Sequence, residues 1–579
     1  MCGIFTLLNN RNTPMSTIKI SFEKGYSRGP ENTTLTPLLE SVLGFHRLAI
    51  NGINDQSNQP IIINDVILIC NGEIYNYKEL YDLIGIHPKT ASDCEIIIHL
   101  YIKYGIEQTL NMIDGEFAFV LYDARIKEKI ETKIYIARDP FGVRPLYILN
   151  YIIDNANSIS NANFETKLYG FASELKSLID IYNINNSQYE LKQFTPGTFS
   201  EFYLSNLVNS FWEPKRENIT YFIPNFSYNN LYNHIDTDLK IIAGNITTYF
   251  NNAVVKRCVN TERPVACLLS GGLDSSLVAA LANNYYKTHY SYQLETYSIG
   301  LAGSEDLKYA RLVSDYLGTN HTEIIVTETE IVDVIPEVIY AIESYDTTTI
   351  RASIGNYLLG KYIKKNSEAK VILNGDGSDE LFGGYIYMNK CPDSIEFDKE
   401  TRRLLKDIYL FDVLRSDKCI SSHGLEPRTP FLDRSFVNYC LSIPSVFRNH
   451  NLLQKPEKFL LRNSFTDQNF LNYQKKQILP DEVLWRKKEA FSDGVTSKNR
   501  SLYQILQENI AIRLQTSESK KYQPCIETEK YYYKKIFDTF YPNCNILPYF
   551  WMPNYVIASD PSARTLDIYS AKSENQEKL

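Results

Sequence analysis

The chain has 579 residues, which is longer than a single domain usually is. Its 44% hydrophobic and 22% charged residues are ordinary for a globular protein, and its formal net charge of −8 argues against a nucleic-acid-binding surface. No apolar run approaches the ~20 residues that span a bilayer. The 10 cysteines form no C-x-x-C pairs and the 8 histidines show no zinc spacing. We therefore expect reduced thiols and a cytoplasmic location, without nucleic-acid or membrane partners.

The first part of the chain, residues 2–200, alternates short strand-like runs with turn signals. Runs rich in β-branched and aromatic residues predict strands at residues 61–63, 66–70, 117–121 and 134–137. A helical pattern covers residues 94–104. The sequence therefore predicts a mostly β first domain with a few helices.

Cys2 carries the clearest chemistry in this part. Removal of Met1 would place the Cys2 thiol, of ordinary pKa about 8.5, beside its own α-amine, of pKa about 7.7–8. The amine can serve as general base for the thiol, so nucleophile and base would share one residue. Any protein can have cysteine at position 2, so the surrounding strings decide between chance and function.

Those strings resemble the class II glutamine amidotransferases, whose nucleophile is the N-terminal residue. They are Met1-Cys2-Gly3-Ile4 and residues 27–31, 46–50, 71–76, 92–95, 114–119 and 138–147. The resemblance implies an αββα sandwich in which Cys2 attacks the side-chain amide of glutamine. It also implies that the Asn71 side chain and the Gly72 N–H form the oxyanion hole, where negative charge develops.

The same resemblance implies a binding site for the amino-acid end of glutamine. Arg47 would clamp the α-carboxylate, and Asp93 with help from Glu73 would hold the α-ammonium. A surface ion pair is the alternative role for Arg47 and Asp93. Glu31 stands where the family usually has aspartate, and we expect its carboxylate to be structural. The full predicted set is Arg47, Leu48, Ala49, Ile50, Asn51, Asn71, Gly72, Glu73 and Asp93.

Residues 201–240 are polar and aromatic without clear periodicity. We predict a connector that wraps the interface between two domains. A disordered linker is the alternative, but disordered segments contain few aromatic residues.

From about residue 241, helical stretches alternate with short buried strands, which predicts a doubly wound parallel α/β sheet with helical additions. The predicted strands are residues 265–269, 295–299 and 370–373. Ligands of such sheets bind beyond the carboxyl ends of the strands. The motifs there are residues 270–276, Gly300 with 304–306, and 374–380.

The first of these motifs is Ser270-Gly271-Gly272-Leu273-Asp274-Ser275-Ser276. A glycine-rich turn at a helix N-terminus presents N–H groups to an anion, and Asp274 could hold Mg²⁺ beside a phosphate. An ordinary strand-to-helix turn is the alternative. The ordered string resembles the pyrophosphate-binding loop of the PP-loop ATP pyrophosphatases, and the chain contains no Walker loop.

Residues 374–380 form a glycine-rich acidic loop after the third predicted strand. A solvated acidic loop is one interpretation. Beside a phosphate loop, its acids are better explained as Mg²⁺ ligands, so Asp274 and Asp379 are the predicted metal residues.

Further strings extend the resemblance to the glutamine-hydrolysing asparagine synthetases over nearly the whole chain. They are residues 345–353, 424–433, 485–495, 549–553 and 560–565. The resemblance implies a synthetase domain over 241–560 and a tail over 561–579. Its reaction would join aspartate to ATP as β-aspartyl-AMP with release of pyrophosphate. Ammonia from glutamine would then cross an internal tunnel and displace AMP.

The resemblance also implies roles in the second domain. Lys488 would balance charge on the α-phosphate, and Lys458 falls in a matching string. Thr348 and Arg351 would belong to the aspartate and phosphate pocket, and a homodimer is expected. The predicted ATP-binding residues are Leu269, Ser270, Gly271, Gly272, Asp274, Ser275, Ser276, Ile299, Asn374 and Gly375.

Departures from the family pattern leave two alternatives open. Asn374 and Asp376 stand where the family usually has serine and glutamate, and Phe459 where it commonly has histidine. The Asp376 side chain reaches about 1.5 Å less far than a glutamate, and misplacement of that order impairs catalysis. One alternative is a β-lactam synthetase-like enzyme acting on another carboxylate. The other is a weakened homologue with a binding role. The predicted catalytic residues are Cys2, Asn71, Gly72, Asp376 and Lys488.

Overall fold

The computed structural model describes residues 1–125, 132–152, 167–184, 188–205, 210–223, 238–290, 292–489, 494–496 and 500–567. The chain divides into two compact units, which are described separately below. Unit 1 is Met1–Ile223 with Ser421–Leu425 and Asp538–Ile546, and unit 2 is the rest of the chain. Parts of the predicted connector (206–209, 224–237) and of the predicted tail (568–579) lie outside the described residues.

Unit 1 contains two six-stranded antiparallel sheets, with strand orders β10-β8-β9-β1-β3-β2 and β12-β11-β7-β6-β5-β4. The first sheet consists of β1 (Gly3–Leu8), β2 (Asn32–Leu38), β3 (Ser41–Arg47), β8 (Tyr147–Tyr151), β9 (Tyr169–Ala172) and β10 (Tyr189–Gln193). The second consists of β4 (Ile61–Ile63), β5 (Val66–Ile74), β6 (Gly115–Asp123), β7 (Lys133–Arg138), β11 (Thr198–Leu204) and β12 (Trp212–Thr220). The predicted strands of this domain are confirmed, and part of the predicted connector forms the edge strand β12.

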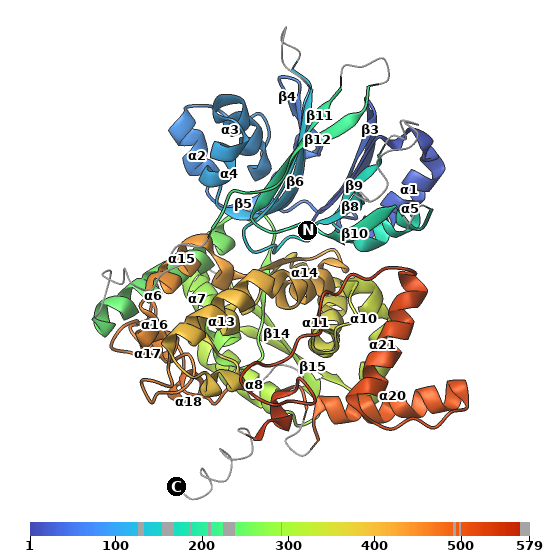
Figure 1. The fold of residues 1–579 in the computed structure, drawn as a ribbon. Helices are drawn as coiled ribbons and strands as arrows, with labels where there is room; N and C mark the ends of the chain where they lie inside the picture. The colour runs from blue at the N-terminus through green and yellow to red at the C-terminus, as the bar shows by residue number, and fades with distance from the viewer. Residues whose placement is uncertain are drawn as a thin grey trace, which may run out of the picture. The chain divides into compact units, whose positions relative to one another are not determined.

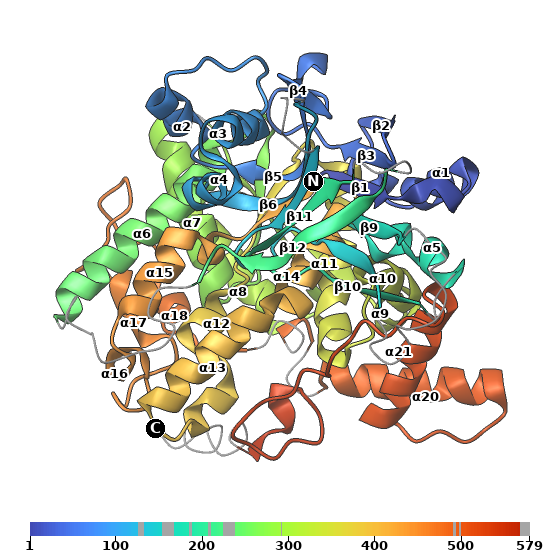
Figure 2. The same ribbon diagram turned by 45° about the horizontal axis from the view of Figure 1, so that its top comes forward.

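Helices cover the outer faces of both sheets, which gives the predicted αββα order of layers (Figures 1 and 2). On one side lie α2 (Tyr77–Ile84), α3 (Ile96–Tyr104) and α4 (Ile106–Met112), and on the other α1 (Met15–Glu23) and α5 (Ile179–Ile184). Successive residues of β6 point to opposite faces of its sheet. Ala118 and Val120 pack between the sheets, whereas Phe119 and Leu121 pack with the residues of α3. Because both faces are covered, the strand is apolar throughout.

Unit 2 is built on a five-stranded parallel sheet with the order β15-β14-β13-β16-β17. Its strands are β13 (Val265–Leu268), β14 (Glu295–Leu301), β15 (Asn320–Val326), β16 (Val371–Leu373) and β17 (Glu426–Arg428). The chain winds outward from β13 in one direction and from β16 in the other. The switch point between β13 and β16 is where doubly wound sheets bind ligands. The predicted strands are confirmed, and β15 and β17 were not predicted.

Helices surround this sheet (Figure 1). Those before β16 are α6 (Leu239–Val259), α7 (Leu273–His289), α8 (Glu305–Leu317), α9 (Glu328–Asp333), α10 (Ile335–Ile342) and α11 (Thr347–Asn366). Those after it are α12 (Ser378–Phe382), α13 (Ser394–Asp407), α14 (Asp412–Ser421), α15 (Arg434–Ser442), α16 (Ser445–Arg448), α17 (Phe459–Ser464), α18 (Asp481–Leu484), α20 (Leu502–Glu518) and α21 (Ile526–Phe540).

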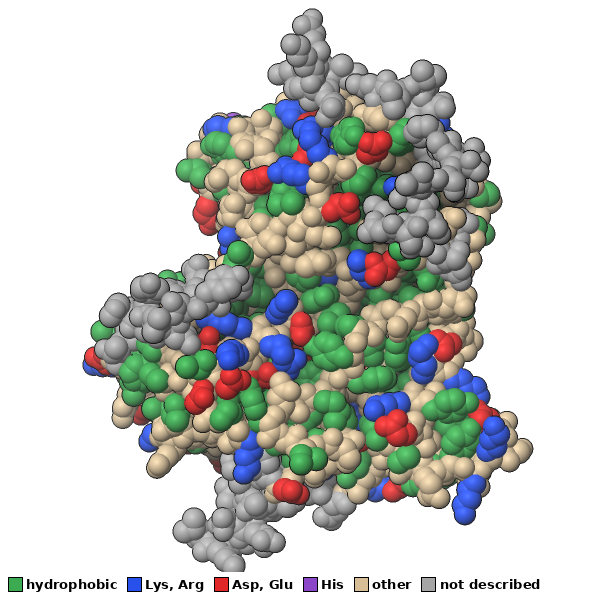
Figure 3. All heavy atoms as spheres, viewed as in Figure 1, with side chains coloured by type: hydrophobic (Ala, Val, Ile, Leu, Met, Phe, Trp, Pro, Cys, Tyr) green, Lys and Arg blue, Asp and Glu red, His purple; other side chains and the backbone are tan. Residues whose placement is uncertain are grey.

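Neither a membrane-spanning helix among the described residues nor a surface patch of one charge on the visible face marks this structure. Among the described residues, none of the helices combines the length and apolarity needed to cross a bilayer. Basic and acidic side chains are interspersed over the face drawn in Figure 3.

Candidate active sites

The predicted phosphate-binding loop of unit 2, residues 270–276 and called the phosphate loop below, lies at the switch point of the sheet and leads from the end of β13 into the first turn of α7. Gly271 has φ +71°, and a Cβ there would lie 2.5 Å from the Cβ of Tyr309, so only glycine fits. A hydrogen bond closes the loop, because the Ser270 N–H donates to Ser275 Oγ at 3.2 Å. The loop residues that line the adjacent cavity are Ser270, Gly272, Leu273, Asp274 and Ser275, whereas the Ser276 side chain is fully buried.

The predicted acidic loop lies directly against the phosphate loop. A Cβ on Gly375 would come within 2.8 Å of the Ser275 nitrogen, so the two backbones approach closely. Ser378 Oγ donates to Asp274 Oδ1 at 2.7 Å and joins the loops through side chains. The tertiary structure thus brings together two motifs whose bonded residues are 104 positions apart in the sequence.

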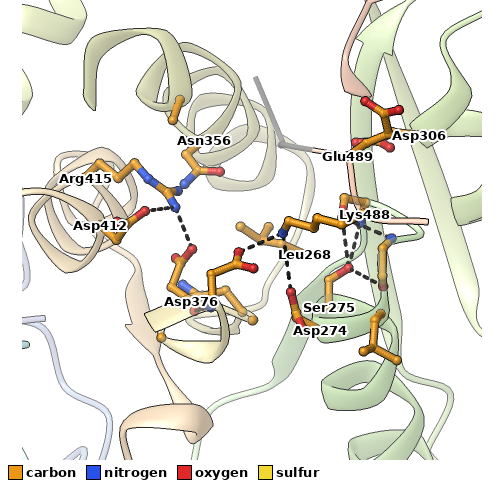
Figure 4. Close-up of a pocket in the computed structure, with 18 of the residues that line it drawn as sticks. Leu268, Asp274, Ser275, Asp306, Asn356, Asp376, Asp412, Arg415, Lys488 and Glu489 are labelled. Atoms are coloured by element: carbon orange, nitrogen blue, oxygen red, sulfur yellow. Dashed lines mark hydrogen bonds and ion pairs between the residues drawn. The ribbon is translucent and has the colours of Figure 1, made fainter. Parts of the chain in front are cut away.

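Two lysines and two carboxylates form the charged centre of the cavity. Lys458 Nζ lies 2.6 Å from Asp274 Oδ2 and 2.7 Å from Asp379 Oδ1. Lys488 Nζ lies 2.7 Å from Asp379 Oδ2 and 3.7 Å from Asp274 Oδ2 (Figure 4). Burial alone would lower the pKa of Lys488, but the charges of Asp379 and Asp274 raise it above its ordinary value. Lys488 is therefore a cation at neutral pH, suited to an anionic ligand.

The carboxylates of this centre suit Mg²⁺ only in company with a ligand. In the described part of the chain, no group of three or more His, Cys, Asp or Glu side chains is placed to hold a metal. Asp274 and Asp379 nevertheless converge on one point, which the ammonium of Lys458 occupies. Mg²⁺ commonly binds one or two carboxylates together with substrate phosphates. The pair fits Mg²⁺ bound with ATP rather than a metal site complete in itself.

A second charged cluster in the same cavity was not predicted from the sequence. Arg415 of α14 donates from Nη2 to Asp376 Oδ1 and to Asp412 Oδ1, both at 2.8 Å (Figure 4). Burial raises the pKa of Asp376, although Arg415 opposes the shift. Asn356 of α11 also lines this part of the cavity. No motif marks Arg415, because its partnership with Asp376 arises only from the fold.

Apolar and amide side chains complete the cavity. Leu269 directly follows β13, and Ile299 lies within the neighbouring strand β14; both line the cavity, as does Thr348 near the start of α11. Asn374 is 4% exposed and donates from Nδ2 to Ser416 Oγ at 2.5 Å. The larger amide at this position therefore has a partner of its own.

The assignment of Arg351 to the aspartate and phosphate pocket stays a prediction, and the structure gives this side chain other partners. Its guanidinium donates to both carboxylate oxygens of Glu529 and of Asp560, at 2.6–2.9 Å. Arg351 is 4% exposed and does not line the cavity that contains the phosphate loop. Two acids from the C-terminal part of the chain neutralise it, and nothing near residue 351 in the sequence reveals them.

In unit 1, the residues predicted to catalyse glutamine hydrolysis lie directly before β1 and in β5. Cys2 Sγ donates to the Leu48 carbonyl at 3.6 Å, and Arg28 Nε donates to the Cys2 carbonyl at 2.9 Å. Asn71 is fully buried on β5 and donates from Nδ2 to Ser173 Oγ at 3.4 Å. A Cβ on Gly72 would lie 2.4 Å from the Glu116 carbonyl, so close strand pairing requires glycine there.

Arg47 and Asp93, the charged residues predicted to bind the amino-acid end of glutamine, are buried rather than paired on the surface. Arg47 is 6% exposed and donates to the Asn54 carbonyl at 3.0 Å and to Asn58 Oδ1 at 2.6 Å. Asp93 is 3% exposed and accepts from the Ile74 N–H at 2.6 Å. These burials exclude the surface ion pair that was the alternative role for both residues.

Short hydrogen bonds also fix the loop after Arg47. Glu31 accepts from the Ala49 N–H at 2.6 Å, in keeping with its expected structural role. Glu73 Oε2 accepts from Asn51 Nδ2 at 2.7 Å. The second bond joins two of the predicted glutamine-binding residues, Asn51 of the loop and Glu73 of β5.

Comparison with known proteins gives matches along nearly the whole chain. Residues 246–396 and 389–552 match the family described as asparagine synthase, and residues 1–204 match a glutamine amidotransferase domain. The chain is 40% identical over 598 residues to a glutamine-hydrolyzing asparagine synthetase of Gallus gallus, covering 99% of both chains. It is 38% identical over 592 residues to that of Homo sapiens, again covering 99% of both. The solved structure of an NMN synthetase from Francisella tularensis is 12% identical and covers 54% of this chain, with a TM-score of 0.22.

Proposed function

Because the chain belongs to the glutamine-hydrolysing asparagine synthetase family, we propose that it makes asparagine from aspartate, with glutamine as nitrogen donor and ATP as energy source. AMP, pyrophosphate and glutamate are the other products. One observation carries the proposal. The cavity of unit 2 combines a phosphate loop, a pair of lysines and a separate arginine–carboxylate cluster. These features suit a nucleotide and an amino acid bound side by side.

We assign the ATP end of the cavity to the phosphate loop and the lysine pair. The loop N–H groups at the start of α7 bind the pyrophosphate portion, because a helix N-terminus attracts anions. Lys488 neutralises charge that develops on the α-phosphate as aspartate attacks and pyrophosphate leaves. Leu269 and Ile299 are placed to contact the adenosine.

Mg²⁺ belongs to this end of the site in the proposal. Asp274 and Asp379 would hold it when ATP is bound, and the ion would supply additional positive charge to the pyrophosphate. Lys458 would then face the phosphates instead of the two carboxylates. The support is the convergence of both carboxylates on one cation.

We assign the aspartate end to Arg415 and its partners. A guanidinium binds a carboxylate in bidentate fashion, which suits the α-carboxylate of aspartate. Asp376 and Asp412 place two further carboxylates beside Arg415, which suits the α-ammonium. This arrangement leaves the β-carboxylate of aspartate to face the α-phosphorus. Thr348 lines the same cavity and supplies a hydroxyl.

Unit 1 supplies ammonia in this proposal. The Cys2 thiolate attacks the glutamine amide, and the Asn71 side chain and Gly72 N–H stabilise the oxyanion. Arg47 and Asp93 bind the amino-acid end of glutamine. Transfer of ammonia to unit 2 rests on the family's chemistry.

The test is an assay of AMP and pyrophosphate release with aspartate, ATP and either glutamine or ammonium. Turnover with both nitrogen sources is expected. No turnover with either source would refute the enzyme. Turnover with another carboxylic acid in place of aspartate would favour the related-synthetase alternative.

Three further statements are proposals that rest on the family resemblance. They are the domain limits 2–200, 201–240 and 241–560 with a tail over 561–579, a cytoplasmic location, and assembly as a homodimer. Light scattering of the purified full-length chain gives its mass in solution, and a mass of one chain would refute the dimer.

A further inference from the structure

Lys488 lies on a segment that is anchored beside the charged centre, by a pair of residues that line the same cavity. Two residues before Lys488, Arg486 has a side chain that is 7% exposed and donates from Nη2 to Asp306 Oδ1 at 2.8 Å. The carbon Cζ of the same guanidinium lies 4.0 Å from the centre of the Tyr309 ring. Both partners belong to the first turns of α8. A planar guanidinium can satisfy a carboxylate and stack on a ring at once, which a lysine cannot do as well.

The described residues that follow this segment, 494–496, approach the same carboxylate, that of Asp306. A Cβ on Gly494 would lie 2.1 Å from Asp306 Oδ2, so glycine is required for this approach. The Leu301 N–H then donates to the Val495 carbonyl at 2.9 Å. Residues 490–493 lie outside the described residues. Asp306 therefore contacts the chain on both sides of them.

Helix α8 also supports the phosphate loop. Gly271 approaches the backbone of Tyr309 and Ala310 so closely that a Cβ would lie 2.4 Å from the Ala310 nitrogen. The loop thus lies against the turn of α8 whose Tyr309 ring stacks on Arg486. In Figure 4, Asp306 and Glu489 lie side by side, and the Lys488 side chain extends from this edge toward Asp274. One helix therefore holds two parts of the nucleotide site.

We propose that Arg486 is a positioning residue, which Asp306 and Tyr309 of α8 hold so that Lys488 is fixed relative to the phosphate loop. The proposal deepens the proposed function and rests on it, since it assigns Lys488 to the α-phosphate. Arg486 itself acts through Lys488 and forms no required bond to ATP. An error of about 1 Å in a reacting group can cost about 100-fold in rate. The Arg486–Asp306 ion pair therefore serves the rate of the reaction by holding Lys488 in place.

Kinetics of the full-length enzyme, with ammonium as nitrogen source, tests the proposal. Arg486→Met is expected to lower kcat for pyrophosphate release by about 10- to 100-fold, with KM for ATP changed less than threefold. Arg486→Lys recovers part of the loss. In a Lys488→Met background, adding Arg486→Met is expected to cost less than twofold. A raised KM for ATP at unchanged kcat, or a full further loss in that background, would overturn the proposal.

Asp306→Asn and Gly494→Ala provide independent variants of the same anchor. Asp306→Asn keeps the side-chain shape, and Gly494→Ala forces the Asp306 carboxylate to move, so both are expected to lower kcat in the same way. Arg513→Met is the control, because Arg513 pairs with Asp333 on the surface. Wild-type kcat in folded Asp306→Asn would contradict the anchor.

Labelling of Lys488 gives a readout that does not need turnover. An amine-reactive reagent and mass spectrometry would measure the rate of modification at Lys488 in each variant. Because Lys488 is held against Asp379, its release in Arg486→Met is expected to speed modification several-fold. An unchanged rate would refute positioning. Absence of turnover in the wild type would refute the proposed function and leave this measurement valid.

Discussion

Replacing Arg415 tests the assignment of the aspartate end most directly. Arg415 is the cation that lies 2.8 Å from both Asp376 and Asp412, and the three side chains are 11%, 15% and 23% exposed. Arg415→Met keeps the length of the side chain and removes its charge. Asp376 and Asp412 then face each other without this cation. One of them is expected to bind a proton, because burial already raises the pKa of Asp376.

The expected loss follows from the hydrogen bonds to the α-carboxylate. A hydrogen bond to a charged group contributes about 1.5–3 kcal/mol. At about 1.4 kcal/mol for each tenfold change, KM for aspartate should rise about 10- to 150-fold in Arg415→Met. Arg415→Lys should lie between this variant and the wild type, since it keeps the charge and loses the planar fork.

The assay is ammonium-dependent pyrophosphate release at saturating ATP over a series of aspartate concentrations. Glutaminase activity without ATP and the thermal unfolding midpoint report whether the variant is folded. Arg513→Met is again the matched control. A folded Arg415→Met enzyme whose KM for aspartate stays within twofold of wild type would refute the assignment.

Three further predictions follow from the two sites. Cys2→Ala should keep ammonium-dependent synthesis and lose the glutamine-dependent reaction, and loss of both in a folded protein would contradict the role of Cys2. Lys488→Met should lower kcat for pyrophosphate release about 100-fold or more, the loss typical of an electrostatic stabiliser, and a wild-type rate would rule out that role. Burial raises the pKa of Asp306 from 3.8 in the unfolded chain to about 6, against the pull of Arg486 and Lys488. The folded state therefore holds this proton more tightly, and the stability it confers is present at low pH and is lost as pH rises through 6. Between pH 5 and 7 the wild type should lose about 1 kcal/mol relative to Asp306→Asn in urea unfolding, and parallel curves would refute the shift.

The departure at Asp376 now has a structural setting. The shorter carboxylate is held by Arg415 and lies beside Asp412. Asn374, the neighbouring departure, is satisfied by Ser416. Both side chains therefore have hydrogen-bond partners, and Asp376 keeps a carboxylate at its position. The turnover assay tests whether Asp376 supports catalysis at the position where the family usually has glutamate.

The sequence by itself determined the features that depend on local order. Strand and helix patterns, the glycine-rich loop after β13 and the acidic loop after β16 are written in consecutive residues. Their backbone chemistry follows from glycine, serine and aspartate at those positions. The strings around Cys2 and in the two loops likewise identify both domains, because each string is a run of neighbouring residues.

Only the tertiary structure decided which distant charges became partners. Arg351 lies in a string that suggested substrate binding, yet Glu529 and Asp560 neutralise it. Arg415 lies in no recognised motif, yet it joins Asp376 across 39 positions of sequence. The physical reason is that a buried charge must find an opposite charge wherever the fold brings one close. That pairing depends on three-dimensional packing, which sequence spacing does not encode.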